Sequence, residues 1–327
     1  MGIIWVNATF GAVARENRLC LTQKLDAQHR NGAILMNYEQ RLIGFVDILG
    51  FGQLVMDSEA DKEKFKLIEG VIAEIQAVDD VYGSPESLFA HSNYDFVSDG
   101  MRGLLNTVYE ETKKSVSAHR VSITTFSDSI VFSCPADSQG LSNFRYFLIK
   151  LFVRVSKFCL LLRGGISCGS LVHTEKAIFG PAMNRAYYTE SKVAKYPRIA
   201  VDENFNEFVD GLQGDAIGQL LKLELILDEL DGVTYLDSLC LATNKVAQNL
   251  CGANAYEILA NEKRTIDVLR DGVHEAEGVL AKINWYANYF NRYLEKASAV
   301  EVVTTTFQGL PFESVMVSVV DLKVSDA

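Results

Sequence analysis

The chain has 327 residues, enough for one large domain or two modest ones at about 100–200 residues per domain. Hydrophobic residues make up 48% and charged residues 22%, with only 5 Pro, so the composition argues against a disordered or fibrous protein. The 31 Lys and Arg against 42 Asp and Glu give a net charge of −11. This charge would repel a polyphosphate backbone, and we expect no nucleic-acid partner.

The sequence also predicts a cytoplasmic protein without a membrane partner. Its most apolar stretch, residues 146–162, is interrupted by Lys150, Arg154 and Lys157, which a bilayer-spanning helix of about 20 apolar residues would tolerate poorly. Residues 1–35 lack the pattern of a signal peptide. The 6 Cys are scattered without the spacing of a zinc finger, which is typical of reduced thiols.

Regular structure is predicted from residue 38, because residues 1–37 show no sustained hydrophobic period and are interpreted as an N-terminal extension. The short apolar run at 41–47 is typical of a buried strand. After a Gly-rich turn at 50–52, apolar residues at spacings of 3 and 4 predict a helix over 65–78.

The following elements predict an α+β sandwich with a central, mostly antiparallel sheet flanked by helices, which we assign to residues 38–240. Two β-rich runs, 121–126 and 130–133, are joined by a tight turn at Ser127, Asp128 and Ser129. The remaining predictions, in chain order, are a loop at 82–100, a helix at about 101–116, a helix at about 141–160, a strand at 161–172, a helix at about 181–194 and a strand at 198–201.

Residues 241–327 are interpreted as a C-terminal helical region with a tail. From Ile266 to Leu294, apolar residues follow alternating steps of 3 and 4 over about four heptads, which favours antiparallel or dimeric helical packing. The alternative is a helix laid on the protein's own core. Residues 298–327 are rich in Val and Thr and predict a final strand or a tail.

Two aspartates stand where neighbouring strands of this sheet would bring them together. Asp47 ends an apolar strand, and Asp128 lies at the tip of the predicted hairpin. Hard Mg²⁺ or Mn²⁺ prefers one or two carboxylates, a backbone carbonyl and substrate phosphate oxygens. Either aspartate alone is more typical of a turn or a cap. The turn after Asp47 would present successive N–H groups at a helix start, as a cradle for a triphosphate.

Four blocks of the sequence, in this order, resemble the class III adenylate and guanylate cyclases. The blocks are Phe45-Val46-Asp47-Ile48-Leu49-Gly50-Phe51, Thr124-Thr125-Phe126-Ser127-Asp128-Ser129, Leu162-Arg163-Gly164-Gly165-Ile166-Ser167-Cys168-Gly169 and Phe179-Gly180-Pro181-Ala182-Met183-Asn184-Arg185-Ala186. They resemble, respectively, the family's first metal-binding signature, the hairpin with its second metal aspartate, its Arg-x-Gly-Ile-x-x-Gly strand and its Gly-x-x-Val-Asn-x-Ala helix start. Their order is far more specific than any single block.

The resemblance implies a site with a nucleoside triphosphate as substrate. Two Mn²⁺ or Mg²⁺ ions would be held by Asp47, Asp128 and the carbonyl of Ile48. The phosphates would be bound by Leu49, Gly50, Phe51 and Arg163. Because the family's site lies between two catalytic domains, the resemblance also implies a homodimer with composite sites, in which Asn184 acts from the other subunit.

Two departures from the family pattern bear on the substrate. Tyr188 stands where the family has an Arg that neutralises transition-state charge, which leaves adjacent Arg185 or a partner-chain cation as substitutes. The family's purine-selecting pair falls on Thr124 and Ala177, which cannot make the purine contacts, while Phe45 can stack on or bound a base. The chain thereby resembles the pyrimidine cyclases of the bacterial Pycsar anti-phage system, which implies cyclic UMP or cyclic CMP as a messenger for a separate effector.

The favoured reaction is two-metal cyclisation of UTP, with release of pyrophosphate and without a protein nucleophile. No GxSxG elbow and no Cys/His signature is present, and the 5 dispersed His are expected to be structural or exposed. The alternatives are a cytidylate cyclase, and an inactive nucleotide-binding sensor suggested by Tyr188. A third is a polymerase-palm-like nucleotidyltransferase, which would not need the helix with Asn184.

Overall fold

The computed structural model describes residues 37–80, 119–212, 214–244, 247, 251–252, 254–272 and 277–301. The chain from Glu39 onward forms one compact unit. The predicted loop at 82–100, the predicted helix at 101–116, the predicted tail after residue 301 and residues 1–36 of the predicted extension lie outside the described residues.

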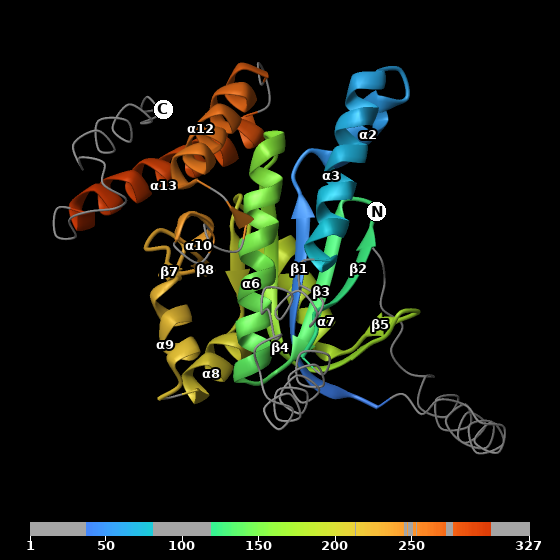
Figure 1. Ribbon diagram of the computed structural model, residues 1–327, viewed down its shortest axis with the longest axis vertical. Helices are drawn as coiled ribbons and strands as arrows, with labels where there is room; N and C mark the ends of the chain where they lie inside the picture. Colours follow the sequence, from blue (N-terminus) through green and yellow to red (C-terminus); the bar gives the residue numbers. More distant parts are fainter. Residues whose placement is uncertain are drawn as a thin grey trace, which may run out of the picture. The chain divides into compact units, whose positions relative to one another are not determined.

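The described strands form one eight-stranded sheet in the order β2-β3-β1-β4-β6-β8-β7, with β5 paired to β4 (Figure 1). Their bounds are β1 (Glu39–Ile48), β2 (Ser122–Phe126), β3 (Ser129–Pro135), β4 (Leu162–His173), β5 (Ile178–Phe179), β6 (Ile199–Val201), β7 (Leu225–Leu227) and β8 (Thr234–Leu236). The pairing of β4 with β6 is parallel, whereas the other pairings are antiparallel. The predicted mostly antiparallel sheet of an α+β protein is confirmed.

Helices surround this sheet. The described helices are α2 (Phe51–Ser58), α3 (Lys62–Asp80), α6 (Ser138–Val155), α7 (Pro181–Tyr188), α8 (Glu203–Gly211), α9 (Ala216–Leu223), α10 (Ser238–Thr243), α12 (Ala255–Gly272) and α13 (Glu277–Glu301). A 3-10 turn, η3 (Ser156–Phe158), follows α6, and a π-helical turn, η4 (Thr189–Val193), follows α7. Helix α7 begins with Pro181, whose fixed φ suits a first turn, as the sequence predicted.

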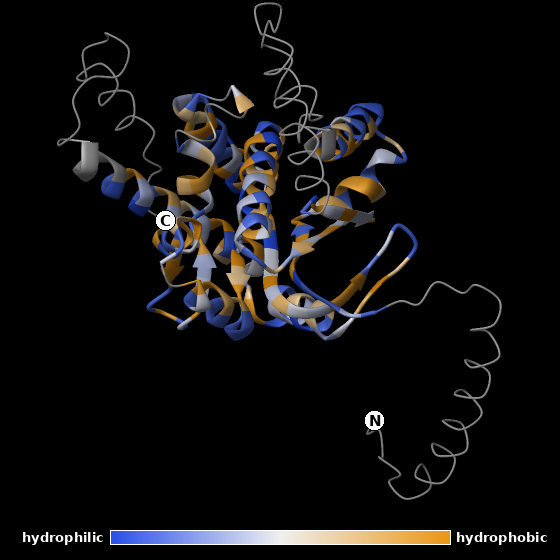
Figure 2. Ribbon diagram, turned by 60° about the horizontal axis from the view of Figure 1, so that its bottom comes forward, coloured by the Kyte–Doolittle hydropathy of each residue, from blue (hydrophilic) through white to orange (hydrophobic). Residues whose placement is uncertain are grey.

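The central strand β1 buries side chains on both faces of the sheet. Leu42 and Val46 belong to the core beneath α3 and α6, whereas Ile43 and Phe45 pack toward α7. Figure 2 shows hydrophobic residues along these strands. Because successive strand residues point to opposite faces, Asp47 lies on the same face as Phe45, the face that α7 covers.

Helix α7 approaches β4 so closely that a glycine is required between them. A Cβ atom at Gly165 would lie 2.2 Å from the carbonyl oxygen of Ala186. Of the glycines predicted to allow close backbone approach in this strand, Gly165 and Gly169 therefore serve the packing of α7, whereas Gly164 faces Phe45 and Val46 of β1.

The C-terminal helices pack on the same unit. Helix α12 ends at Gly272 and α13 begins at Glu277, so the predicted heptad stripe is divided between two helices. Ile266 of α12 and Phe290 of α13 share a buried cluster with Tyr235 of β8. The described part of the stripe thus covers the protein's own core, which is the alternative to the predicted helical packing, and α12 also packs against α13.

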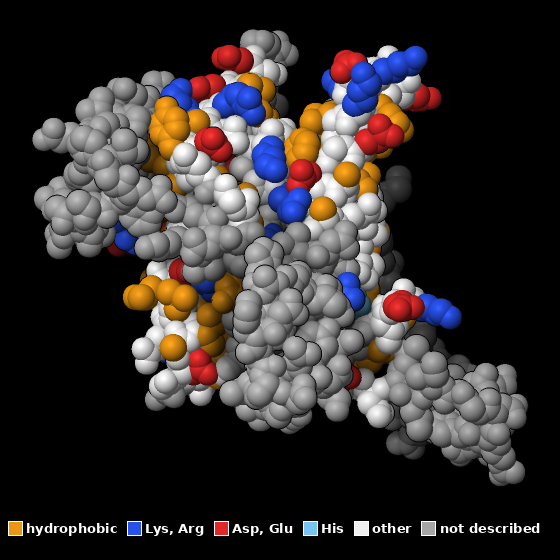
Figure 3. Space-filling model, in the orientation of Figure 1, with side chains coloured by type: hydrophobic (Ala, Val, Ile, Leu, Met, Phe, Trp, Pro, Cys, Tyr) orange, Lys and Arg blue, Asp and Glu red, His pale blue; other side chains and the backbone are white. Residues whose placement is uncertain are grey.

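Charged side chains are interspersed on the face shown in Figure 3. Glu74 of α3 lies between two cations, forming ion pairs with Arg154 and with Lys157. Among the helices in the described ranges, none combines the length and apolar character needed to cross a membrane.

Candidate functional site

Asp47 and Asp128 meet at one end of the sheet. Asp47 is the penultimate residue of β1 and pairs with Ser129, the first residue of β3, in antiparallel register. Asp128 precedes Ser129 in the β2–β3 turn, and its carbonyl accepts the Ile48 N–H at 3.0 Å. The structure therefore brings the two predicted carboxylates together through strand pairing.

The two carboxylates repel each other. Burial, and then the charge of Asp128, raise the pKa of Asp47 to about 6, although the nearby Arg163 cation partly offsets both. Two neighbouring carboxylates repel each other when both are ionised, and a bound divalent cation would offset this electrostatic repulsion. In the part of the chain that the structure describes, no three acidic, His or Cys side chains form a metal cluster. The Ile48 carbonyl and substrate phosphates would therefore complete such a site.

The predicted phosphate cradle lies at the start of α2. Gly50 has a φ of 81°, in the left-handed region that favours glycine, and it precedes the helix without a side-chain cap. The Leu49 N–H donates to the carbonyl of Leu161 at 2.9 Å, and the Phe51 side chain is buried in the core. The N–H groups left for an anion are those of Gly50 and the first turn of α2.

Arg163 is engaged within the chain. It lies opposite Asp47 on β4, and its Nη2 is 3.3 Å from the Asp47 Oδ2. Its Nε donates to Glu190 Oε1 at 2.8 Å, and Nη2 also bonds to that oxygen. Glu190 is not among the predicted site residues, although an acid just after the Asn184 block, in the same helical run, was a usable signal.

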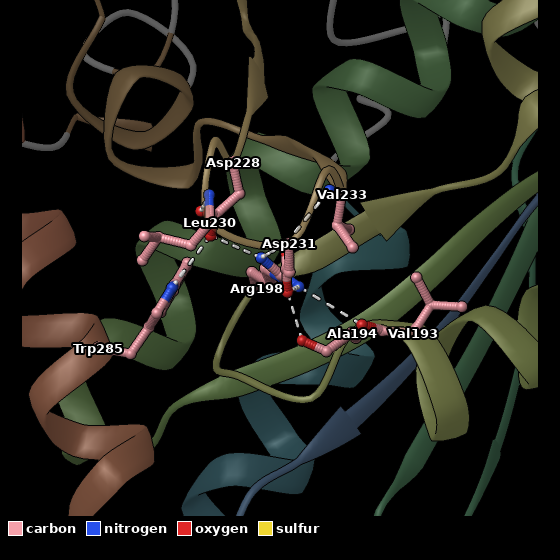
Figure 4. Close-up of polar contacts among 8 residues, drawn as sticks. All are labelled: Val193, Ala194, Arg198, Asp228, Leu230, Asp231, Val233 and Trp285. Atoms are coloured by element: carbon pink, nitrogen blue, oxygen red, sulfur yellow. Dashed lines mark hydrogen bonds and ion pairs between the residues drawn. The ribbon is translucent and has the colours of Figure 1, made fainter.

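The end of η4 is fixed by Arg198, whose side chain is 1% exposed (Figure 4). Its Nε donates to the carbonyl of Ala194 at 3.0 Å, Nη1 donates to Asp228 at 2.8 Å, and Nη2 donates to Asp231 at 2.5 Å. Trp285 of α13 donates its indole N–H to the same Asp228 carboxylate at 3.2 Å. One buried guanidinium thereby links the C-terminal helix to the π-helical turn beside the site.

The predicted site residues of α7 are Asn184, Arg185 and Tyr188. Among the described residues, none of the three forms a hydrogen bond or ion pair with Asp47 or Asp128 of the same chain. Arg185 donates to Ser167 Oγ at 3.1 Å and to the Cys168 carbonyl at 2.8 Å. At about 3.3 Å per strand residue, these partners lie roughly 13–17 Å along β4 from Arg163. Asn184 is exposed, and Tyr188 is 61% exposed.

The predicted base pocket contains an aromatic surface that the sequence analysis missed. Phe45 is only 5% exposed, because its ring packs 5.3 Å from that of Tyr187 and 6.0 Å from that of Phe126. These covering rings are themselves 54% and 45% exposed. Phe126 stands two residues before Asp128, which was a usable signal, and it is the more accessible surface for a base.

Thr124 is bonded to a histidine that the sequence analysis left aside. Its Oγ1 is 3.0 Å from His173 Nε2, and Ser133 Oγ is 2.7 Å from the other ring nitrogen. Burial, and then the charge of Arg41, lowers the pKa of His173 to about 4. Ala177 lies in the turn that joins β4 to β5, directly before Ile178, the residue that pairs with His173. The β4–β5 hairpin therefore contacts Thr124 through the His173 side chain.

No model of a known protein family matches the chain, and no curated protein is significantly similar to it. What the chain does must therefore be inferred from its own residues.

Proposed function

We propose that the chain is a nucleotide cyclase that converts a pyrimidine triphosphate, UTP ahead of CTP, into the 3′,5′-cyclic monophosphate and pyrophosphate. The observation that carries this proposal is the meeting of Asp47 and Asp128 beside the uncapped helix start at Gly50. The order of the four sequence blocks supports a class III cyclase-like sandwich as the finer description of the fold.

Within this proposal, the carboxylates of Asp47 and Asp128 would hold two Mn²⁺ or Mg²⁺ ions, and the first turn of α2 would bind phosphate oxygens. When bound, the ions would lower the pKa of the ribose 3′-hydroxyl and neutralise charge on the departing pyrophosphate. The 3′-hydroxyl loses its proton to water, its oxygen forms a bond to the α-phosphorus, and the bond from that phosphorus to the bridging oxygen breaks, so that pyrophosphate leaves. The protein supplies position and charge, and no covalent intermediate is needed.

We also propose a homodimer with composite sites, in which Asn184 and Tyr188 serve the carboxylates of the partner. Both residues are exposed in the single chain. Three further aromatic rings in or near α7 are 43–54% exposed, those of Phe126, Phe179 and Tyr187. Clustered apolar exposure of this kind marks interaction surfaces. The messenger role toward a separate effector in anti-phage defence rests on the sequence resemblance.

A second candidate function is a nucleotide-binding sensor without turnover. Arg163 is already paired with Glu190 and Asp47, and Tyr188 offers no positive charge. A site short of cations would bind a triphosphate through metal and backbone without stabilising the transition state.

The test is to incubate the full chain with each of the four NTPs and Mn²⁺, and to measure bound nucleotide and cyclic product separately. We expect the largest amount of cyclic product from UTP. Asp47→Ala and Asp128→Ala should each lower it by at least about 100-fold without loss of the folded protein. The matched control is Asp57→Ala on α2, an acid paired with Lys64, which should retain activity. Binding without any product would favour the sensor, and faster cyclisation of ATP or GTP would contradict the pyrimidine assignment.

A further inference from the structure

A line of hydrogen bonds crosses the sheet face beside Thr124. The Arg41 side chain, from β1, donates Nε to Ser133 Oγ at 2.9 Å and Nη2 to the Ser133 carbonyl at 3.1 Å. Ser133 of β3 is fully buried, and its Oγ is 2.7 Å from His173 Nδ1. The other ring nitrogen, Nε2, is 3.0 Å from Thr124 Oγ1 on β2.

The chemistry of Arg41 fixes the direction of the first bond, and the tautomer of His173 sets the direction of the other two. A guanidinium has only donors, so Ser133 Oγ accepts from Arg41. Its other side-chain partner in the described residues is His173, and the tautomer that accepts at Nδ1 is the one that gives the single proton of Ser133 Oγ a partner there. A neutral imidazole whose Nδ1 accepts carries its proton on Nε2, and Nε2–H therefore donates to Thr124 Oγ1.

A charged imidazolium would donate from both ring nitrogens and so reverse the bond to Ser133, but the surroundings oppose it. Burial, and then the nearby Arg41 cation, holds the pKa of His173 at about 4, so the ring is neutral near pH 7. Because Thr124 Oγ1 receives the proton of His173, its own hydroxyl proton is directed to another acceptor.

Thr124 stands beside the exposed aromatic surface. Alternation along β2 puts Thr124 and Phe126 on one face, and the Phe126 ring is 45% exposed and 6.0 Å from that of Phe45. Two residues beyond Phe126 is Asp128. A ring on which a base can stack and a hydroxyl obliged to donate thus lie next to the proposed reaction centre.

We infer that Thr124 reads the substrate base as a hydrogen-bond donor and so selects a keto base over an amino base. Uracil presents the O4 acceptor where cytosine presents an N4 amino donor, and guanine differs from adenine in the same sense. The inference rests on the proposed function and deepens it, because it assigns UTP over CTP to a definite group. Arg41, Ser133 and His173 act as positioning residues, since they set the hydroxyl of Thr124 without touching the base.

The test compares kcat/KM for UTP and CTP in matched variants of the full chain. Thr124→Val removes the hydroxyl at constant shape and should lower the UTP-to-CTP ratio by about tenfold, the loss of about one hydrogen bond. Ser133→Ala removes the hydroxyl that holds the His173 proton on Nε2. With that proton on Nδ1, Thr124 donates to the ring, and the ratio should shift toward CTP. Thr125→Val, next along β2 and exposed on the opposite face, should leave the ratio unchanged.

A second readout does not depend on turnover. In ¹⁵N-histidine NMR of the free protein at pH 7, His173 should be neutral with its proton on Nε2 in the wild type, and on Nδ1 in Ser133→Ala. A neutral wild-type ring with its proton on Nδ1, or an unchanged ratio in Thr124→Val, would overturn the inference. If no nucleotide is cyclised, the proposed function fails. The ratio of UTP and CTP dissociation constants in the same variants then decides the inference by the same criteria.

Discussion

Replacing Asp128 with Asn should stabilise the metal-free protein while it removes the proposed activity. The pKa of Asp47 rises from 3.8 to about 6, by burial first and by the charge of Asp128 second. A raised pKa means that the folded state holds the proton more tightly than the unfolded state. The contribution of Asp47 to the free energy of unfolding is therefore fully present below about pH 4 and is lost as the pH rises through about 6.

The size of the effect follows from that shift. A difference of about 2 pH units at about 1.4 kcal/mol each corresponds to about 3 kcal/mol of unfolding free energy lost by pH 8. The burial contribution remains in Asp128→Asn, and only the charge contribution disappears. We expect the variant to regain about 1 kcal/mol at pH 8 and close to nothing at pH 4.

Urea unfolding of both proteins at pH 4 and pH 8, in EDTA, measures this difference. With Mn²⁺ added at pH 8, the order should reverse, because the wild type gains binding free energy that the variant loses. Asp57→Asn, which removes the partner of Lys64, is the control and should show no gain at pH 8. A metal-free Asp128→Asn protein that is less stable than the wild type at pH 8 would refute the reasoning and make Asp128 a turn residue.

Three further predictions follow from the same structure. Co-refolding inactive Asp47→Ala and Asn184→Ala chains at equal amounts should restore about a quarter of wild-type activity, because half of the dimers are mixed and each has one intact site. A monomeric active species in sedimentation would contradict this. Trp285→Phe removes the indole N–H bond to a buried carboxylate and should cost about 1–3 kcal/mol in urea unfolding, so an unchanged midpoint argues against that link. Gly165→Ala should cost about 3 kcal/mol or more, whereas Gly211→Ala, which meets no atom within 4 Å, should cost little.

Much of the fold was predictable because local patterns decide it. The apolar run at 41–47 forms β1, whose side chains are buried on both faces of the sheet. The short turn before Ser129 is long enough only for a tight hairpin between β2 and β3. The C-terminal stripe was harder to predict. Spacings of 3 and 4 continue from Ile266 to Leu294 whether or not the chain reverses between them, so the pattern did not predict two helices.

Some contacts of the site were likewise predictable from local sequence pattern, and others were not. The meeting of Asp47 and Asp128 follows from antiparallel pairing, which the sequence already indicated. The partners of Arg163 and Thr124 do not follow from local pattern, because they depend on how α7 and the β4–β5 hairpin fold over the sheet. The sequence marks Glu190 only as an acid after the Asn184 block, and its pairing with Arg163, like that of His173 with Thr124, is visible only once tertiary packing is known.

The identity of the product formed from UTP tests the central claim most directly. Mass spectrometry of a reaction with the full chain, UTP and Mn²⁺ should find a uridine monophosphate lighter than UMP by one water, in equal amount to pyrophosphate, and none of it with Asp128→Asn. Formation of UMP would indicate hydrolysis, and formation of uridine dinucleotides would indicate a nucleotidyltransferase. Either result, or the absence of any product from UTP, would contradict the assignment of this chain as a uridylate cyclase.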